Sequence, residues 1–140
     1  MLAKELMKQE VERVLPSDTV HLAARTMRDA NVGFLPVCDE DDVVLGTLTD
    51  RDIVIRLVAE NRPATEPVAT VMTGEVVACR PDDDIRAALA RMREAQKARI
   101  VVTGEDGHLL GVISLSDIAQ HVDAEQVAET MRQVTEREAA

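Results

Sequence analysis

The chain of 140 residues contains no tryptophan and no tyrosine, and its only phenylalanine is Phe34. Proteins that bind single-stranded nucleic acid stack the bases on aromatic side chains, so this composition argues against such a platform. A formal net charge of −10 also repels a phosphate backbone. We therefore expect no nucleic-acid partner. A single nucleotide could still bind wherever a few basic residues converge.

Long apolar runs are also missing. No stretch approaches the roughly 20 apolar residues needed to span a membrane. The N-terminus MLAKELMKQE lacks the apolar region of a signal peptide. We expect a cytoplasmic protein with no membrane partner. A content of 46% hydrophobic and 30% charged residues is sufficient for a core, and the length fits one compact domain or a pair of half-size units.

Residues suited to metal binding or disulfide formation are few. The two cysteines, Cys38 and Cys79, each lie in a short apolar stretch, so we expect small buried hydrophobes instead of a disulfide. The three histidines, His21, His108 and His121, have no partner at ligand spacing. The sequence therefore predicts no metal site and no required cofactor.

What the sequence does contain is an internal repeat. Pro16 aligns with Pro81, 65 positions later, and the register holds without a gap through Glu60 and Glu125. Upstream of both copies, the methionines at 7 and 72 keep the same spacing. Identical pairs include Met27 and Met92, Arg28 and Arg93, Val37 and Val102, Leu45 and Leu110, Gly46 and Gly111, Asp52 and Asp117, and Ile53 and Ile118.

Each repeat predicts the order β-α-β-β-α. The first helix of each copy follows the proline, with Ser17 or Asp82 as the expected N-cap. Its apolar stripe has the spacing i, i+3, i+4, i+7 of one buried helix face. The stripes are Val20, Ala23, Ala24 and Met27, and Ile85, Ala88, Leu89 and Met92. The expected strands are 11–14, 32–38 and 43–48, then 76–79, 99–103 and 109–113, with second helices from Asp50 and Leu115.

These patterns predict an α+β (α/β) fold of two similar units. A unit of about 60 residues buries too little surface alone, so we expect the two to pack pseudo-symmetrically through their sheets. The predicted boundaries are 1–63 and 64–125, with a linker at 61–67. A helical extension at 126–140 carries Val127, Met131 and Val134 at helical spacing. It would serve dimer contacts or cover the core.

The start of each second helix has two interpretations. Thr49 precedes Asp52 by three positions, as Ser114 precedes Asp117, which is the pattern of a capping box. Alternatively, a helix start beside a strand end suits a polar ligand, and a carboxylate there can accept hydrogen bonds from both hydroxyls of a ribose. Arg51 would add a cation for phosphate oxygens. The same arrangement in both repeats favours a pair of binding sites.

The sequence resembles the cystathionine-β-synthase (CBS) domain family over about residues 1–125. GTLTDRDI from Gly46 and GVISLSDI from Gly111 closely match the start of that family's second helix, and GFLPV from Gly33 resembles its central strand. Two such motifs in a gapless tandem repeat make the resemblance specific. It implies a stand-alone regulatory pair of CBS domains, without catalysis, whose inter-domain cleft binds AMP, ADP, ATP or a related adenosyl compound.

The resemblance also implies roles for individual residues, one from each repeat. Asp52 and Asp117 would hold the ribose hydroxyls, assisted by Thr49 and Ser114. The remaining pairs are Thr47 and Val112, which would flank the adenine, and Gly33 and Ala98, which would offer backbone groups to the base edge.

For phosphate, the resemblance points to three basic residues. Arg99 would reach the phosphate of the ligand at Asp52, Arg51 would contact it from the helix start, and Lys97 could assist. The alternatives are a surface or ion-paired arginine and a solvated lysine. Ser116 replaces the equivalent of Arg51 in the second repeat, so we expect the Asp52 site to bind phosphate better.

Two other functions are alternatives to nucleotide binding. An enzyme is not expected, because the chain has no room for a catalytic barrel of about 250 residues such as that of IMP dehydrogenase, and no Ser-His-Asp set is evident. A protein-interaction module with vestigial clefts would leave the two aspartates as helix caps only. In that family dimers form through helices, so a homodimer is expected, with an unidentified effector protein as a further partner. The stripe Ile53, Val54, Leu57 and Val58 would supply the dimer face or belong to the core.

Overall fold

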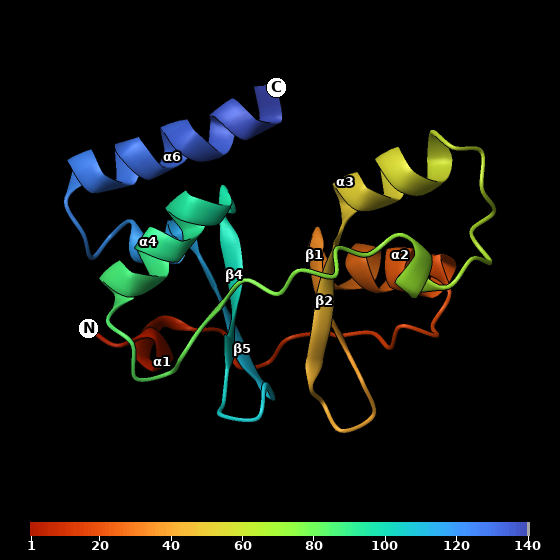
Figure 1. The fold of residues 1–140 in the computed structure, drawn as a ribbon, viewed down its shortest axis with the longest axis horizontal. Helices are drawn as coiled ribbons and strands as arrows, with labels where there is room; N and C mark the ends of the chain where they lie inside the picture. Colours follow the sequence, from red (N-terminus) through yellow and green to blue (C-terminus); the bar gives the residue numbers. More distant parts are fainter. Residues whose placement is uncertain (140) are drawn as a thin grey trace. The chain divides into compact units, whose positions relative to one another are not determined.

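The computed structural model describes residues 1–139 and divides the chain into two compact units (Figure 1). One unit comprises Val11–Val76 and contains the first repeat; we call it the first-repeat unit. The other joins Met1–Glu10 to Val77–Ala140 and contains the second repeat; we call it the second-repeat unit. Among residues 1–139, no helix is long and apolar enough to cross a membrane.

The first-repeat unit is a two-stranded sheet with helices packed on it. Its antiparallel strands β1 and β2 are joined by a hairpin, with an irregularity at Val37 and Cys38. Its core contains Val20, Leu35 and Leu48. The elements are α2 (Val20–Ala30), β1 (Phe34–Cys38), β2 (Val44–Thr49), α3 (Asp50–Ile53), the π-helical turn η1 (Val54–Val58) and the 3-10 turn η2 (Val68–Thr70).

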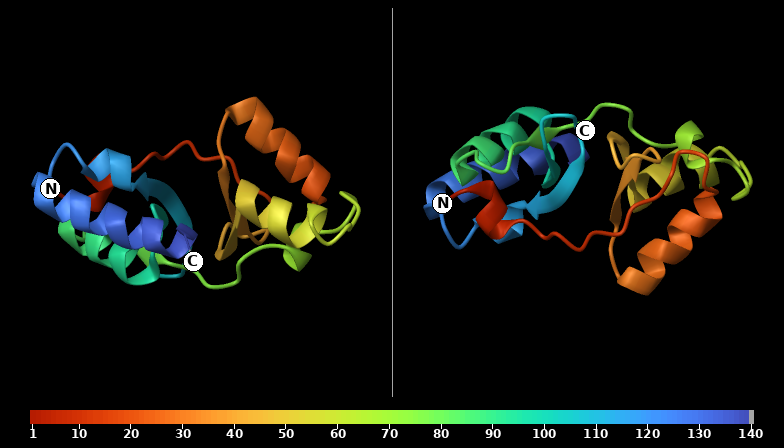
Figure 2. Two further views of the ribbon diagram at one scale, coloured as in Figure 1. Left: turned by 90° about the horizontal axis from the view of Figure 1, so that it is seen from above. Right: turned by 90° about the horizontal axis from the view of Figure 1, so that it is seen from below.

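The second-repeat unit has a three-stranded sheet in the order β3-β4-β5. Strand β3 is parallel to β4, and β4 is antiparallel to β5. Helix α6 lies along α4 (Figure 2). The elements are α1 (Ala3–Leu6), β3 (Ala78–Cys79), α4 (Ile85–Ala95), β4 (Arg99–Thr103), β5 (Leu109–Ser114), α5 (Leu115–Ile118) and α6 (Ala124–Ala139).

Both first helices begin two residues later than predicted. Thr19 caps α2 by accepting from the Leu22 N–H at 3.1 Å, and Asp84 caps α4 by accepting from the Arg86 N–H at 2.9 Å. Ser17 and Asp82 are therefore wrong as caps. The reason is a turn before each helix, which Asp18 closes by accepting from the Leu15 N–H in one copy. In the other copy Asp83 accepts from the Arg80 N–H.

The predicted stripes are buried except at one position. Val20, Ala23 and Met27 face the core of the first-repeat unit, whereas Ala24 is exposed. All four stripe residues of α4 are buried. Leu89 occupies the position equivalent to Ala24, and its longer side chain reaches neighbours that a methyl group does not.

The predicted strands 11–14 and 76–79 are both shorter than expected, and the strand at 11–14 is shortened most. Only Val14 pairs there: it donates to Pro36 O at 3.2 Å and accepts from the Cys38 N–H at 2.9 Å. The ladder cannot extend back to residue 12 because Pro36 has no N–H to donate. In the second repeat Val101 stands in the place of Pro36, its N–H donates to Val77 O at 3.3 Å, and a strand forms at Ala78–Cys79.

The two compact units do not coincide with the repeats at the segments upstream of each repeat. Residues 1–10 belong to the second-repeat unit, where Ala3 is fully buried in the core. Residues 64–76 belong to the first-repeat unit, so the predicted linker at 61–67 lies inside it. There Val20 donates to Glu66 O at 2.9 Å and His21 to Ala64 O at 2.9 Å. The segment upstream of each repeat therefore completes the unit of the other repeat.

The C-terminal helix forms as expected, two residues earlier than predicted. Helix α6 begins at Ala124 and buries Thr130 and Val134, while Met131 stays 53% exposed. Arg93 of α4 donates to Thr130 Oγ1 at 3.3 Å, and Gln96 donates to Gln133 O at 3.1 Å. The helix thus covers α4 with mixed polar and apolar contacts. The last predicted residue, 140, lies outside the described residues.

Candidate functional site

The end of β2 and the start of α3 form one continuous turn. The β1–β2 register places Phe34 opposite Thr49, so the beginning of β1 lies beside this turn. Thr49 Oγ1 accepts from the Asp52 N–H at 3.1 Å, and Asp52 Oδ2 accepts from the Thr49 N–H at 2.9 Å. The capping box predicted from the sequence is therefore present.

The second repeat builds the same turn. Ser114 Oγ accepts from the Asp117 N–H at 3.2 Å, and Asp117 Oδ2 accepts from the Ser114 N–H at 3.0 Å. Ser116 adds a hydroxyl whose oxygen lies 2.9 Å from Ser114 Oγ. Ser114 is buried, whereas Ser116 is exposed.

The capping bonds orient each carboxylate and leave part of it unused. Both Asp52 and Asp117 are half-buried. In each, Oδ2 accepts the capping bond, and Oδ1 has no hydrogen-bond partner among residues 1–139. A carboxylate oxygen has lone pairs for donors other than its own backbone. Each turn therefore presents one oriented acceptor that a hydroxyl-bearing ligand could use.

The backbone groups beside these turns are largely paired. Gly33 O accepts from the Asp50 N–H at 3.0 Å, and Ala98 O accepts from the Leu115 N–H at 2.7 Å. At these two positions the carbonyl already accepts one hydrogen bond, and the backbone N–H is the donor that could contact a base edge.

The next pair, Thr47 and Val112, has no free backbone group. Thr47 exchanges both backbone bonds with Thr73, and Val112 does so with Lys8. Only their side chains can flank a ligand; that of Thr47 is half-buried and that of Val112 is buried.

The basic residues differ in environment. Arg51 and Arg99 are exposed, and neither forms an ion pair within the described part of the chain. Arg99 lies opposite Ser114 in the β4–β5 register, the position that Phe34 holds opposite Thr49. Lys97 is half-buried. Within its own unit, Arg99 is thus next to the Ser114–Asp117 turn.

Sequence reasoning missed Asp50. A Cβ added to Gly33 would lie 2.7 Å from Asp50 Oδ2, so this carboxylate covers the glycine. Its Oδ1 accepts from the Arg51 N–H at 2.9 Å. The equivalent residue, Leu115, is apolar and buried. The mismatch between Asp50 and Leu115 in otherwise matching motifs was the available signal, and it makes the two turns differ in charge.

Two segments of the sequence, residues 3–59 and 68–124, match the family model of the CBS domain. The chain belongs to the CBS domain family. Its two β-α-β-β-α repeats are two CBS domains, and the family resemblance of the sequence is confirmed.

Relatives of known sequence support this assignment. The chain is 36% identical over 116 residues to the CBS domain-containing protein YhcV of Bacillus subtilis. The matched region covers 83% of this chain and 81% of that protein. It is 32% identical over 133 residues to Hypoxic response protein 1 of Mycobacterium tuberculosis, covering 94% and 92% of the two chains.

Solved structures share the fold. Hypoxic Response Protein I, solved with two coordinated zinc ions, has a TM-score of 0.79 at 33% identity, covering 88% of this chain and 100% of that chain. The CBS domain pair of protein MJ0100, in complex with 5′-methylthioadenosine and S-adenosyl-L-methionine, has a TM-score of 0.77 at 20% identity, covering 86% and 94%. The cytosolic domain of the Mg²⁺ channel MgtE, in complex with ATP, has a TM-score of 0.76 at 25% identity, covering 86% and 48%. The mixed α+β fold is confirmed.

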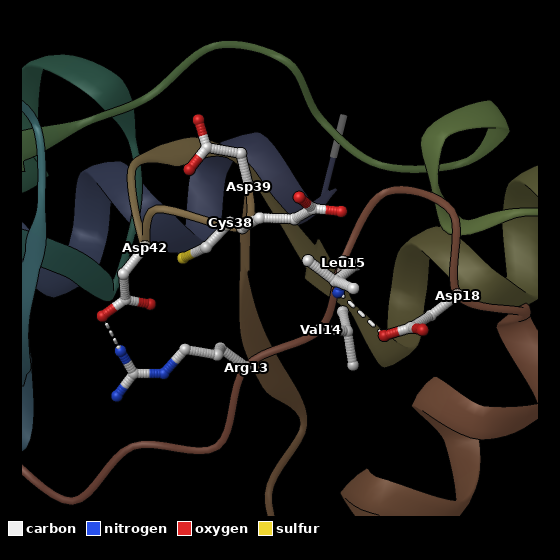
Figure 3. A pocket seen from close by; sticks show the side chains of 8 residues that line it. Arg13, Val14, Leu15, Asp18, Cys38, Asp39 and Asp42 are labelled. Carbon is white, nitrogen blue, oxygen red and sulfur yellow. Dashed lines mark hydrogen bonds and ion pairs between the residues drawn. The ribbon is translucent and has the colours of Figure 1, made fainter.

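A pocket of about 390 Å³ lies at the other end of the first CBS hairpin (Figure 3). Four carboxylates line it, those of Asp18, Asp39, Glu40 and Asp42, against one cation, Arg13, which pairs with Asp42. Cys38 and Asp39 mark the hairpin end of β1, whereas the Thr49 turn lies at the opposite end of the sheet. An excess of negative charge disfavours phosphate, so this pocket is not part of the candidate site.

The cysteines of both CBS domains are free and buried. Burial raises the pKa of the Cys38 and Cys79 thiols to about 11, so both are protonated at neutral pH and are poor nucleophiles and metal ligands. Among the side chains that the structure describes, those of residues 1–135, no group of three or more His, Cys, Asp or Glu could hold a metal ion.

Proposed function

We propose that this CBS pair is a cytoplasmic regulatory module that binds AMP, ADP, ATP or a related adenosyl compound and performs no catalysis. It would need no metal and no cofactor. The observation that carries the proposal is the equivalent geometry of Asp52 and Asp117. Each is fixed by its own cap, and each has one carboxylate oxygen without a partner among residues 1–139.

The chemistry of these turns suits a ribose. The unpaired oxygen of Asp52 or Asp117 would accept hydrogen bonds from the vicinal hydroxyls, as acidic residues do in nucleotide sites. Thr49 Oγ1 already accepts a backbone bond, which leaves its O–H free to donate to the sugar or to a base nitrogen. In the second domain, Ser114 and Ser116 form a hydroxyl pair for the same purpose.

The base and the phosphates would contact the flanking residues. The Gly33 and Ala98 N–H groups would donate to the base edge, beside the side chains of Thr47 and Val112. The exposed guanidinium groups of Arg51 and Arg99 are suited to phosphate oxygens, and Lys97 would assist.

We further propose that the Asp52 site binds phosphate better than the Asp117 site. Arg51 lies within the turn of the first domain, and Ser116 takes its place in the second. The Asp50 carboxylate beside Gly33 opposes part of this preference, because like charges repel. Calorimetric titration of Asp52→Asn and of Asp117→Asn measures the net effect.

Two structural neighbours motivate the choice of ligands. Protein MJ0100 was solved with 5′-methylthioadenosine and S-adenosyl-L-methionine, and MgtE was solved with ATP. Both ligand sets share an adenosine moiety and differ in charge. A test of this chain should therefore include phosphorylated and unphosphorylated adenosyl compounds.

A thermal-shift series with AMP, ATP, NAD and S-adenosylmethionine tests the proposal. A ligand at about 100 times its Kd stabilises the native state by roughly 2.7 kcal/mol. Calorimetric titration of Asp52→Asn and Asp117→Asn then isolates each site. Asparagine keeps an acceptor for the capping N–H and loses the charge, so we expect at least tenfold weaker binding with little loss of stability. No response to any of the four ligands would refute nucleotide binding.

The second candidate function is a protein-interaction module with vestigial ligand sites. It is favoured by the bonds that both carboxylates make to their own backbone, since a helix cap alone explains those bonds. Under this alternative, the double variant Asp52→Ala, Asp117→Ala loses stability and shows the same lack of nucleotide binding as the parent protein.

We also propose a homodimer formed by the first CBS domain. Val54, Ile55 and Val58 are 54%, 49% and 63% exposed on one helical stretch, and Leu57 of the same stretch is buried. The apolar stripe predicted at residues 53–58 therefore lies partly on the surface and partly in the core. An exposed apolar cluster on a helix is typical of a protein interface.

The exposed apolar surface is specific to the first CBS domain, because the equivalent positions in the second domain are not apolar in the same way. They are Ala119, Gln120 and Asp123, which offer little apolar area. We expect Val54→Asp with Val58→Asp to convert a dimer to a monomer in light scattering, whereas Met131→Asp, at an equally exposed site on α6, leaves it unchanged. A monomeric parent protein would contradict the homodimer and favour an effector protein as the occupant of this surface.

A further inference from the structure

Arg56 makes an unusual long-range contact in the first CBS domain. It lies in the π-helical turn η1, one turn after Asp52. Its Nη1 donates to Met72 O at 2.9 Å and to Val71 O at 3.2 Å. A charged donor shared by two backbone carbonyls forms stronger hydrogen bonds than a neutral one. The side chain therefore ties the helix that carries Asp52 to the segment at 71–72.

That segment forms the wall beside the candidate site. Thr73 follows Met72 directly and exchanges two backbone bonds with Thr47, at 3.0 and 2.9 Å. A Cβ on Gly46 would collide with Thr73 O, so strand and segment touch without a gap. Two residues after Thr47, the strand ends at the Thr49 cap. Arg56 thus links the helix that follows Asp52 to the segment that pairs with the strand.

The second CBS domain holds its equivalent segment by other means. There Lys8 pairs with Val112, and the preceding residue, Met7, donates to Ala3 O at 2.9 Å at the end of helix α1. The residue equivalent to Arg56 is His121, whose side chain makes no hydrogen bond within residues 1–139. The arginine clamp therefore belongs to the first domain alone.

We infer that Arg56 is a positioning residue for the ligand at Asp52, setting the distance between the Asp52 carboxylate and the wall formed by residues 71–73. This inference rests on the proposed nucleotide binding and adds a residue to it that contacts no ligand group. Binding sites need their contacts held within fractions of an ångström by supporting hydrogen bonds, and loosening that support weakens binding. The two sites of one chain should then respond differently to the loss of Arg56.

The test uses the full chain carrying Asp117→Asn, in which only the Asp52 site binds. Calorimetric titration with AMP and with ATP is compared for Arg56, Arg56→Lys and Arg56→Gln. We expect Arg56→Gln to weaken binding about tenfold, the effect of one lost charge-assisted bond, and Arg56→Lys to give an intermediate value. In the Asp52→Asn background, which leaves only the Asp117 site, Arg56→Gln should leave affinity unchanged. His121→Gln is the matched control in both backgrounds.

Urea denaturation of the same variants separates positioning from stability. If Arg56→Gln lowers the unfolding midpoint while AMP and ATP bind as in its parent, Arg56 is structural only and the inference is overturned, although nucleotide binding stands. If the Asp117 site weakens equally, the effect is global and the inference is again overturned. A parent protein that binds no nucleotide overturns both. Should Arg56→Gln not fold, Arg56→Lys carries the comparison, because it retains the charge and loses the forked geometry.

Discussion

Thr73 pairs with Thr47 across what would otherwise be an open strand edge, with backbone bonds of 3.0 and 2.9 Å in the two directions. Lys8 pairs with Val112 in the same way, at 2.9 and 3.0 Å. Each pair joins the segment upstream of one repeat to the last strand of the other. Unpaired strand edges invite aggregation, and here each repeat covers the edge of its neighbour. The two CBS domains are therefore interdependent along the chain.

The glycine before each pairing residue should be intolerant of a side chain. A Cβ on Gly46 would overlap Thr73 O, and one on Gly111 would lie 2.7 Å from Lys8 O. We expect Gly46→Ala and Gly111→Ala each to reduce the free energy of unfolding by about 2 kcal/mol in urea denaturation, the usual cost of overpacking. Gly74→Ala is the control, because nothing lies within 4 Å of its added Cβ. Equal stability of all three variants would contradict the close approach.

The N-terminal residues should stabilise the second-repeat unit and not the first-repeat unit. Ala3 has no exposed surface and lies in the core with Ile85 and Ile118. Ala3→Asp would bury a charge without a partner, so we expect a loss of about 3 kcal/mol or more. Ala24→Asp, on an exposed helix position, should cost far less.

Hydrogen exchange locates the effect of Ala3→Asp. We expect faster exchange in β4 and β5, with β1 and β2 retaining their protection. Uniform loss of protection in both domains would show that they unfold as one unit.

The cysteine thiols should make stability fall at high pH. Burial raises the pKa of Cys38 and Cys79 to about 11, whereas an unfolded thiol ionises near pH 8.5. Between these values the unfolded chain binds fewer protons than the native state, so stability is complete below about pH 8.5 and decreases as the pH rises toward 11. Urea denaturation at several pH values measures this decrease. In Cys38→Ala with Cys79→Ala the decrease should be smaller, and an identical pH profile would rule out the thiols as its source.

The contact between α6 and α4 should depend on Thr130. Its hydroxyl donates to Gln126 O at 2.9 Å and accepts from Arg93 Nη2 at 3.3 Å. Arg93 Nε is buried and has no hydrogen-bond partner among the side chains that the structure describes. Thr130→Val keeps the shape and leaves a second guanidinium nitrogen unpaired, so we expect a loss of about 1 kcal/mol in thermal or urea unfolding. Thr135→Val, at an exposed position of the same helix, should be close to neutral, and equal effects at the two sites would argue against the Arg93 contact.

Much of each site could be predicted because its determinants are local. The helix starts at Thr49 and Ser114 follow from residues three positions apart, whose side chains reach the backbone without help from the rest of the fold. The helix stripes followed from periodicity in the same way, except at Ala24. The caps of α2 and α4 lie two residues later than the pattern predicts, because Asp18 and Asp83 each form a turn hydrogen bond before the helix begins.

The residues missed were those whose partners are distant in the chain. Asp50 covers Gly33, and Arg56 reaches the carbonyls of Val71 and Met72, contacts that no spacing rule encodes. The ladder at Val14 does not extend toward residue 12 because Pro36 has no N–H. This effect of the proline arises only when the two segments lie side by side.

The sequence by itself determined the repeat, the order of its strands and helices, the two capped turns and the membership of the CBS family, since each is written in short-range patterns and their recurrence. Only the tertiary structure decided which repeat each upstream segment completes. Lys8 and Thr73 bond to strand edges more than 20 residues away along the chain, and the choice between two similar edges is made by packing that involves the whole unit. These pairings decide how the chain divides into compact units. They are backbone hydrogen bonds, which any residue except proline can form, so the side chains in the sequence do not predict which strand edge is used.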